Sequence, residues 1–489
     1  MSNLRWSFGR PGMPDLTSLT LAEASERLQE RSVSAVELME ATLQRIEATE
    51  PLIHAFAWRD ADAAMDAARR ADESRVNGLA NGPLHGIPVG VKDLLYTKDI
   101  PTEAGSRVLT GFVPTHDATV VRKLRDAGAI VVGKTVTHEF AYGQNVPETR
   151  NPWQLDSYPG GSSAGSGAAV AARSLFAAIG TDTGGSVRTP SAVNGIVGLK
   201  PTYGLVSRNG CVPMSTSLDH IGPMTRTVLD TAILLEAIVG FDAGDPASLR
   251  SPVVDYRSGL GAGIRGMRIG IDTGYFFYDK VQAPVRKAVE TAIDVLVSLG
   301  AVRVDISIPE LEWSTTVGNV TTEVDMSTWH RQLLRSKGGH YHPGTRLMLE
   351  LGELIPGTHY VLAQQARTRI RGAVRRTFAE HRLDALLGPT IPVTAPRLDD
   401  LSVDLVDEAA DGGLATLVHH EYPANVTGLP ALSVPCGFSE AGLPIGFQAI
   451  GKPLHEMTLL RLGHAYQGAT PWHTMQPDLV ATQPVGGSR

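Results

Sequence analysis

Two serine-bearing turns are the part of this sequence best suited to chemistry. The stretch from Gly160 to Gly167 reads GGSSAGSG and residues 182–188 read DTGGSVR, so Ser162 and Ser186 lie 186 − 162 = 24 residues apart. Glycine lets backbone N–H groups approach a ligand closely, and serine supplies a hydroxyl. The turns therefore fit a nucleophile beside an oxyanion hole, and equally a pair of tight turns with serine caps.

Two other patterns match known motifs but lack the local structure that those motifs require. GAIVVGKT at 128–135 fits the phosphate-binding pattern GxxxxGK[ST], yet a helical pattern precedes it and its middle is typical of a strand, with Lys134 near the end. GSSAG at 161–165 fits a nucleophile elbow centred on Ser163, but the turn-like DSYPG stands where the elbow needs a strand. We therefore expect neither nucleotide binding nor an α/β-hydrolase elbow.

A lysine at position 92 supplies a base for such a serine. It follows the apolar run Ile87–Val91, which predicts a short buried strand with Lys92 at its end. A serine hydroxyl is a weak nucleophile until a base takes its proton, and burial favours the neutral amine that can accept one. A second hydroxyl relays the proton where the amine and the nucleophile do not touch, as in known Ser–Lys arrangements.

The strings GVKDL, GGSSAGSG and DTGGSVR resemble the amidase signature family, as do TRNPW, which precedes GGSSAGSG, and GLKPTYG, which follows DTGGSVR. The resemblance covers most of the chain, from SxxELMEATLQRIE to LPALSVPCGF and GLPIGFQAIG. It implies a Ser-cisSer-Lys triad in which Ser186 is the nucleophile, Ser162 the bridging serine after a cis bond from Gly161, and Lys92 the base. The resemblance also implies an oxyanion hole of backbone N–H groups from Thr183, Gly184, Gly185 and Ser186.

Other residues are expected to support this site. Asp182 and Arg188 flank the nucleophile turn and should brace it by hydrogen bonds, with Ser163 as a further supporting residue. Candidate walls of the substrate pocket follow the strand at 129–132 and are Tyr142, Gln144 and Asn145. The poorly patterned segment 310–345 should add loops, rimmed by Trp313, Trp329 and Tyr341. Departures from the commoner family pattern leave the triad groups intact but bear on the substrate, and they are Ala164, Thr189 and Asn194.

Composition excludes several classes of protein. The 489 residues carry a net charge of −7, which argues against a nucleic-acid or anionic-membrane surface. The two cysteines, Cys211 and Cys436, form no disulfide framework or Cys-rich metal site. The histidines lack metal-ligand spacing, and His85 and His138 are interpreted as structural or pocket residues. We expect no cofactor, no metal and no membrane span, since no run of 18 apolar residues occurs.

The expected setting follows from the same features. MSNLRWSFGR lacks the apolar core of a signal peptide, and a reducing compartment suits two unpaired cysteines, so we expect a cytoplasmic protein. Its expected partner is a small-molecule amide substrate, and a homodimer is allowed for.

The fold class is α/β. The resemblance implies one large α/β/α sandwich, a mixed sheet covered by helices on both faces, over residues 17–470, between an irregular arm at 1–16 and an irregular tail at 471–489. The alternation of apolar and helical runs at 130–240 favours a largely parallel sheet. Capping boxes at Thr20–Glu23 and Ser34–Glu37 predict helix starts. The remaining patterns predict helices at 21–31, 35–48, 60–71, 117–127, 283–299, 360–381 and 455–468.

The function implied is hydrolysis of an amide carbon–nitrogen bond through a Ser186 acyl-enzyme. An alternative within the family is a glutaminase like the glutaminase subunit of glutamyl-tRNA amidotransferase, because TRNPW and SLDHIGPMTRT resemble that protein too. A carbamate or ester hydrolase would use the same triad. A binding protein without catalysis is disfavoured by the intact Lys92, Ser162 and Ser186.

Overall fold

The computed structural model describes residues 15–80, 82–142, 145–252, 254–401 and 417–479. Eleven strands form one sheet in the order β1-β3-β2-β4-β6-β5-β10-β11-β9-β7-β8. The strands are β1 Phe56–Arg59, β2 Pro88–Lys92, β3 Ile130–Thr135, β4 Ala177–Asp182, β5 Val197–Lys200, β6 His220–Thr225, β7 Arg268–Asp272, β8 Val302–Ile306, β9 Ala385–Pro389, β10 Ala431–Phe438 and β11 Pro444–Gly451.

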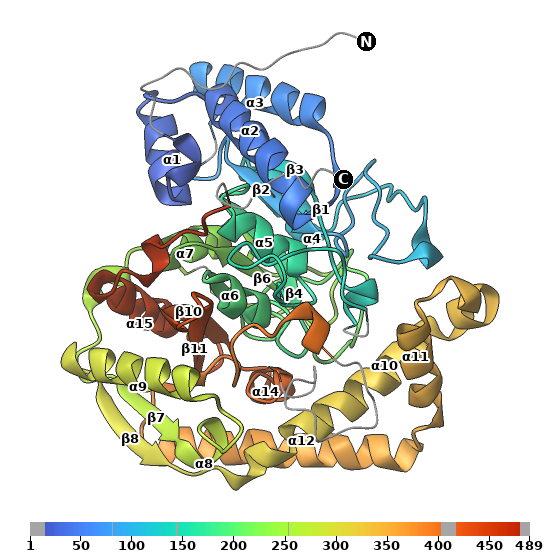
Figure 1. Ribbon diagram of the computed structural model, residues 1–489, viewed down its shortest axis with the longest axis vertical. Coiled ribbons are helices and arrows are strands. Elements are labelled where there is room, and N and C mark those ends of the chain that lie inside the picture. The colour runs from blue at the N-terminus through green and yellow to red at the C-terminus, as the bar shows by residue number, and fades with distance from the viewer. Residues whose placement is uncertain (1–14, 81, 143–144, 253, 402–416, 480–489) are drawn as a thin grey trace, which may run out of the picture.

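Helices surround this sheet (Figure 1). Every residue of β2, β4, β5, β6, β9 and β11 is buried, so both faces of the central sheet are covered, because successive strand residues point to opposite faces. The α-helices are α1 Leu21–Gln29, α2 Ala35–Ile53, α3 Ala61–Val76, α4 Thr119–Asp126, α5 Ala164–Ala171, α6 Arg188–Asn194, α7 Val228–Ile238, α8 Thr273–Phe276, α9 Ala283–Ser298, α10 Ser314–Lys337, α11 Pro343–Leu354, α12 Gly357–Glu380, α14 Tyr422–Thr427 and α15 Glu456–Ala469.

The sheet is mixed, as the family resemblance implies. Parallel pairing joins β2 to β3 and β4, and joins β7 to β8 and β9. The prediction of a largely parallel sheet at 130–240 is wrong, since β6 runs antiparallel to both β4 and β5. An apolar run marks a strand as buried, but the direction of the strand depends on the path of its connections.

The predicted local signals at the N-terminus are confirmed. Thr20 accepts a hydrogen bond from Glu23 N and the Glu23 carboxylate accepts one from Thr20 N, and Ser34 and Glu37 pair in the same way. These two boxes start α1 and α2, which lie with α3 at the top of Figure 1, above the β1, β2 and β3 end of the sheet.

The helix α5 connects the two serine-bearing turns and lies deep in the molecule. All eight of its residues are buried, because Gly, Ala and Ser let it approach its neighbours closely. A Cβ on Gly165 would clash with the backbone at Ala55 O and Val136 N. This packing places the turn before α5 and the turn before α6 beside the carboxyl ends of β2 and β4.

The segment 310–345 is not a set of loops, as the weak pattern suggested. It forms α10 and the start of α11, which lie with α12 away from the centre of the sheet (Figure 1).

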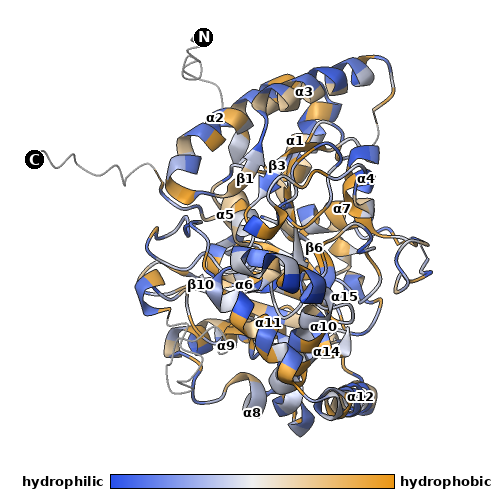
Figure 2. Cartoon of the chain, turned by 90° about the vertical axis from the view of Figure 1, so that its right-hand side faces the viewer, coloured by the Kyte–Doolittle hydropathy of each residue, from blue (hydrophilic) through white to orange (hydrophobic). Residues whose placement is uncertain are grey.

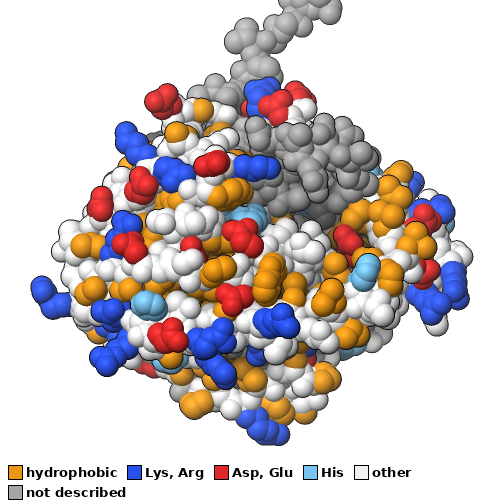
Figure 3. All heavy atoms as spheres, turned by 90° about the horizontal axis from the view of Figure 1, so that it is seen from below, with side chains coloured by type: hydrophobic (Ala, Val, Ile, Leu, Met, Phe, Trp, Pro, Cys, Tyr) orange, Lys and Arg blue, Asp and Glu red, His pale blue; other side chains and the backbone are white. Residues whose placement is uncertain are grey.

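In the hydropathy view α12 is mostly hydrophilic, whereas α7 is hydrophobic (Figure 2). Hydrophobic side chains gather toward the right of the view from below (Figure 3). The exposed large apolar residues of α11 are Leu347, Leu351 and Leu354.

Candidate active site

Lys92 lies at the end of β2, fully buried, with hydroxyl groups around its amine. Its Nζ donates to Ser162 Oγ and to Thr181 Oγ1, each at 2.7 Å. Within the described residues no carboxylate forms an ion pair with it. Burial lowers the pKa of Lys92 to about 7, against the opposing effects of Cys211, Asp182 and Asp219. A large share of this amine is therefore neutral near pH 7 and able to accept a proton.

Ser162 stands directly after a cis peptide bond from Gly161, as the resemblance implies. The backbone is tightly enclosed here, because a Cβ on Gly161 would clash with the His138 ring and lie 2.6 Å from Tyr158 Oη. The Ser162 carbonyl accepts from His138 N at 3.2 Å. These contacts orient the Ser162 hydroxyl toward Lys92.

Ser186 lies between β4 and α6 and is half-buried, so a substrate can reach it. Its carbonyl accepts from Ser163 N at 3.3 Å, which joins the two turns. In the part of the chain that the structure describes, no hydrogen bond links Ser186 Oγ to Ser162 Oγ. Such contacts often close only when substrate binds, so the arrangement remains compatible with a relay.

The four predicted oxyanion donors are not equivalent. The N–H groups of Thr183, Gly184 and Ser186 have no acceptor among the described residues, whereas Gly185 N donates to Asp182 Oδ1 at 2.9 Å. Three unpaired N–H groups in one turn can hold a developing negative charge. The Gly185 N–H instead helps to hold the turn in place.

Asp182 and Arg188 brace the nucleophile turn by hydrogen bonds. Arg188 Nε donates to Asp182 Oδ2 at 3.0 Å, and Val187 N donates to the same oxygen at 3.2 Å. Burial alone would raise the pKa of Asp182, but Arg188 and Lys200 hold it below its usual range. The aspartate is thus a fixed anion that orders the backbone around Ser186.

Ser163 and the two histidines near the motifs have other contacts. Ser163 Oγ donates to Thr181 O at 3.2 Å and accepts from Thr181 N at 3.3 Å, so it ties α5 to β4. No strand leads into Ser163, and the 128–135 motif is largely strand β3. His85 Nε2 lies 2.9 Å from Ala71 O, and burial lowers the pKa of His138 to about 3.

The predicted pocket residues lie in different settings. Tyr142 is buried in a cluster with Met326 of α10, while Asn145 Oδ1 accepts from Glu139 N at 2.9 Å. Gln144 lies outside the described residues. Of the predicted rims, the side chains that are largely exposed are Trp313 and Trp329, whereas Tyr341 is buried and bonded to His330.

Sequence reasoning missed three residues at this site. Thr181 is the second hydroxyl on Lys92, Glu421 packs against Gly185, and Tyr422 packs against the same turn. A Cβ on Gly185 would clash with the Glu421 carboxylate, which accepts from Thr189 Oγ1 at 2.5 Å. Thr181 is recognisable as the residue before Asp182 in a strand, but no local pattern signals Glu421 or Tyr422.

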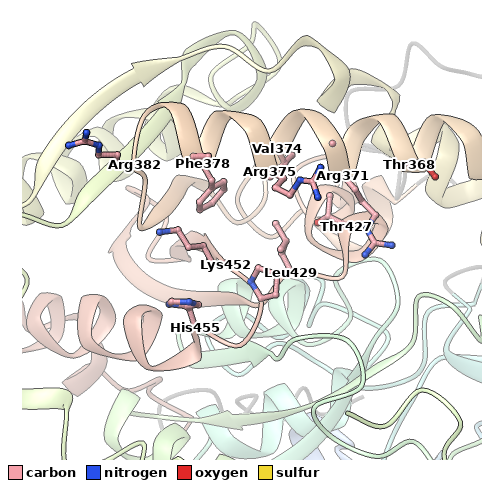
Figure 4. A pocket seen from close by; sticks show the side chains of 14 residues that line it. Thr368, Arg371, Val374, Arg375, Phe378, Arg382, Thr427, Leu429, Lys452 and His455 are labelled. Carbon is pink, nitrogen blue, oxygen red and sulfur yellow. The ribbon is translucent and has the colours of Figure 1, made fainter. Parts of the chain in front are cut away.

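A groove lies elsewhere, between α12 and the start of α15. Its volume is about 830 Å³, with Phe378 of α12 on one side and Leu429 and Lys452 on the other (Figure 4). None of the three triad candidates lines it, so the groove is not the site of chemistry. Among the described residues no cluster of metal-ligating side chains occurs, and no helix there is long and apolar enough to cross a membrane.

Known proteins resemble this chain over most of its length. A family model described as Amidase matches residues 37–460. An amidase of Pseudomonas putida is 44% identical over 96% of this chain and 99% of its own length, and a glutamyl-tRNA(Gln) amidotransferase subunit of Chloroflexus aurantiacus is 43% identical over 96% and 100%. The native peptide amidase of Stenotrophomonas maltophilia superposes with a TM-score of 0.79 at 32% identity, covering 94% of this chain and 98% of that one.

Proposed function

The chain belongs to the Amidase family of amide-hydrolysing enzymes, and on that premise we propose that it cleaves a carbon–nitrogen amide bond through an acyl-enzyme on Ser186. The observation that carries this proposal is the buried Lys92 amine, which has hydroxyl partners at 2.7 Å and a pKa lowered to about 7. Such an amine is a base ready at neutral pH.

The reaction begins when Ser186 Oγ attacks the carbonyl carbon of the amide. Its proton passes through Ser162 Oγ to Lys92 Nζ, while the N–H groups of Thr183, Gly184 and Ser186 stabilise the oxyanion (the Gly185 N–H being held by Asp182). Collapse of the tetrahedral intermediate breaks the carbon–nitrogen bond, and the proton returns from Lys92 to the leaving amine. Water then attacks the acyl-enzyme with the same base, releasing the acid and restoring Ser186.

A sulfonyl fluoride tests the identity of the nucleophile. Intact mass should show one adduct, and peptide mapping should place it on Ser186. Ser163→Ala is the matched control, because Ser163 is the adjacent motif serine and is tied to Thr181 rather than to Lys92. Labelling that survives in Ser186→Ala but disappears in Ser163→Ala would overturn the proposal.

A glutaminase like the amidotransferase subunit is the second candidate. It is supported by the 43% identity to that subunit, which nearly equals the 44% identity to the amidase. The purified chain alone should hydrolyse anilides if it is a free-standing amidase. Activity confined to glutamine, and gained only with partner proteins, would favour the second candidate. Esters and carbamates in the same panel test the breadth of acyl-enzyme chemistry.

The free cysteines Cys211 and Cys436 support a cytoplasmic setting.

A further inference from the structure

The ring of Tyr422 connects the nucleophile turn to α10. A Cβ on Gly184 would lie 3.0 Å from this ring, and a Cβ on Gly318 would clash with it. Tyr422 Oη donates to Asn319 Oδ1 at 2.7 Å. The face of α10 that carries Gly318 and Asn319 therefore forms a wall beside the N–H groups of the nucleophile turn.

Glu323 stands one helical turn beyond Asn319 on this same face. Residues four apart in a helix are neighbours on its surface, so the Glu323 carboxylate extends the wall that begins at Tyr422. Its charge acts on the phenols of Tyr142 and Tyr422 and contributes to the raised pKa of each, after burial. Glu323 thus shares a face of α10 with Asn319, which binds the tyrosine whose ring covers Gly184.

The Glu323 carboxylate has no cationic partner within the described residues. No ion pair or side-chain hydrogen bond involves it, although the side chain is half-buried and burial raises its pKa. The internal stretches outside the described ranges (81, 143–144, 253 and 402–416) contain no Lys, Arg or His. A partly buried carboxylate is stabilised when a cation approaches it, and near the nucleophile turn the substrate can bring that cation.

We propose that Glu323 is a specificity residue that binds a protonated amine on the substrate, so that this enzyme prefers amides carrying a positive charge near the scissile bond. The inference rests on the proposed function, because it assigns the substrate class of that same site. Burial raises the pKa of both Tyr142 and Tyr422, so their phenols stay neutral and bring no competing charge to the pair. An ion pair in such a setting strengthens binding more than an exposed one does.

The test compares p-nitroanilides that differ by one group. Each ω-amino acyl anilide is paired with an isostere in which methyl replaces the ammonium group, over graded chain lengths, and a second series carries the amine on the leaving side. We expect the wild type to favour the amine-bearing partner in one series by about tenfold or more in kcat/KM. Glu323→Gln should abolish that preference while leaving the neutral isostere within about twofold.

Matched variants separate a charge effect from damage to the fold. Glu350→Gln removes the same charge from an exposed pair with Arg346 on α11, and its preference should equal that of the wild type. Glu323→Lys should reverse the preference toward substrates with a carboxylate. Thermal melting of each variant checks folding.

Two results keep this inference distinct from the proposed function. Equal preference ratios in the wild type and Glu323→Gln would overturn the role of Glu323 while leaving the Ser186 chemistry intact. Turnover that persists in Ser186→Ala would instead overturn the proposed function, whatever Glu323 does.

Discussion

Two lysines lie at the carboxyl ends of neighbouring parallel strands of this sheet, and only one of them has a carboxylate as partner in the described part of the chain. Lys92 ends β2 and Lys134 lies one residue before the end of β3, and both side chains are fully buried. Lys134 Nζ lies 3.2 Å from Asp93 Oδ1 and donates to Leu95 O at 2.8 Å. Lys134 Nζ also donates to the Thr102 hydroxyl, whereas the partners of Lys92 Nζ among the described residues are hydroxyls alone, with no carboxylate among them.

The partner, rather than burial, thus decides the protonation state that each of these buried lysines favours. Burial lowers the pKa of both amines, but Asp93 opposes that shift at Lys134 and favours its ammonium form. Asp93 directly follows Lys92 in the sequence, yet its carboxylate lies at Lys134. Successive residues of an extended chain point to opposite sides, so adjacency along the chain keeps Asp93 away from Lys92.

The largest expected difference is in activity. Lys92→Met should lower kcat/KM on an anilide by about 10⁴-fold or more, because the proposed triad acts as a unit and loses its base. Lys134→Met should keep kcat/KM of its folded fraction within about tenfold, since Lys134 acts in structure only. Steady-state kinetics with active-site titration measures both, and equal losses in the two variants would refute the distinction.

Ser162 provides a check on the same path. Ser162→Ala should lose less than Lys92→Met, because a water can replace the relay hydroxyl. The double variant should be little worse than Lys92→Met alone, as expected for two residues that serve one path.

In stability the two lysine variants should rank in the opposite order. Lys134→Met leaves Asp93 buried without its cation and should lower the free energy of unfolding by about 3–5 kcal/mol. Adding Asp93→Asn should recover much of that loss, and denaturant unfolding measures both. A Lys134→Met protein as stable as the wild type would show that the ion pair contributes nothing.

Lys92→Met should be at least as stable as the wild type. The folded pKa of Lys92 is about 7 and the unfolded value about 10.4, so the unfolded chain binds more protons between these values. The contribution of Lys92 to stability therefore rises with pH across this window, and below pH 7 its penalty is complete. The increase in the free energy of unfolding from Lys92→Met should therefore be greatest below pH 7.

The third prediction is the pH profile of activity. The neutral form of Lys92 is required, so kcat/KM should rise about tenfold per pH unit below a pKa of about 7 and level off above it. Lys134→Met should keep this limb in place. A profile that is flat from pH 5 to 8, a range of about three units, would exclude Lys92 as the base.

The smallest expected effect belongs to Thr181. Thr181→Val removes one of the two hydroxyls on Lys92 Nζ and should lower kcat/KM by about tenfold or less, the usual contribution of one hydrogen bond. Thr102→Val removes a hydroxyl that accepts from Lys134 Nζ at 2.6 Å and is the matched control. It should leave kcat/KM unchanged.

Elements that depend on neighbours along the chain could be predicted from the sequence. The capping boxes at Thr20 and Ser34, the strand before Lys92 and the helix predicted at 283–299 are all present near their predicted places. These features follow from side-chain periodicity and from hydrogen bonds within three or four residues. The family strings likewise made it possible to select Lys92, Ser162 and Ser186 from many serines and lysines.

Contacts between residues far apart in the sequence, by contrast, follow from the packing of the whole fold. In the folded chain the Thr181 hydroxyl accepts from Lys92 Nζ, the Gly185 N–H donates to Asp182, and Tyr422 of α14 packs against α10. The weak pattern of 310–345 could not predict α10, because the residues of this helix pack on several neighbours rather than along one apolar stripe. Partners far apart in the sequence leave no local periodicity, so the choice between Lys92 and Lys134 depends on where folding places one carboxylate.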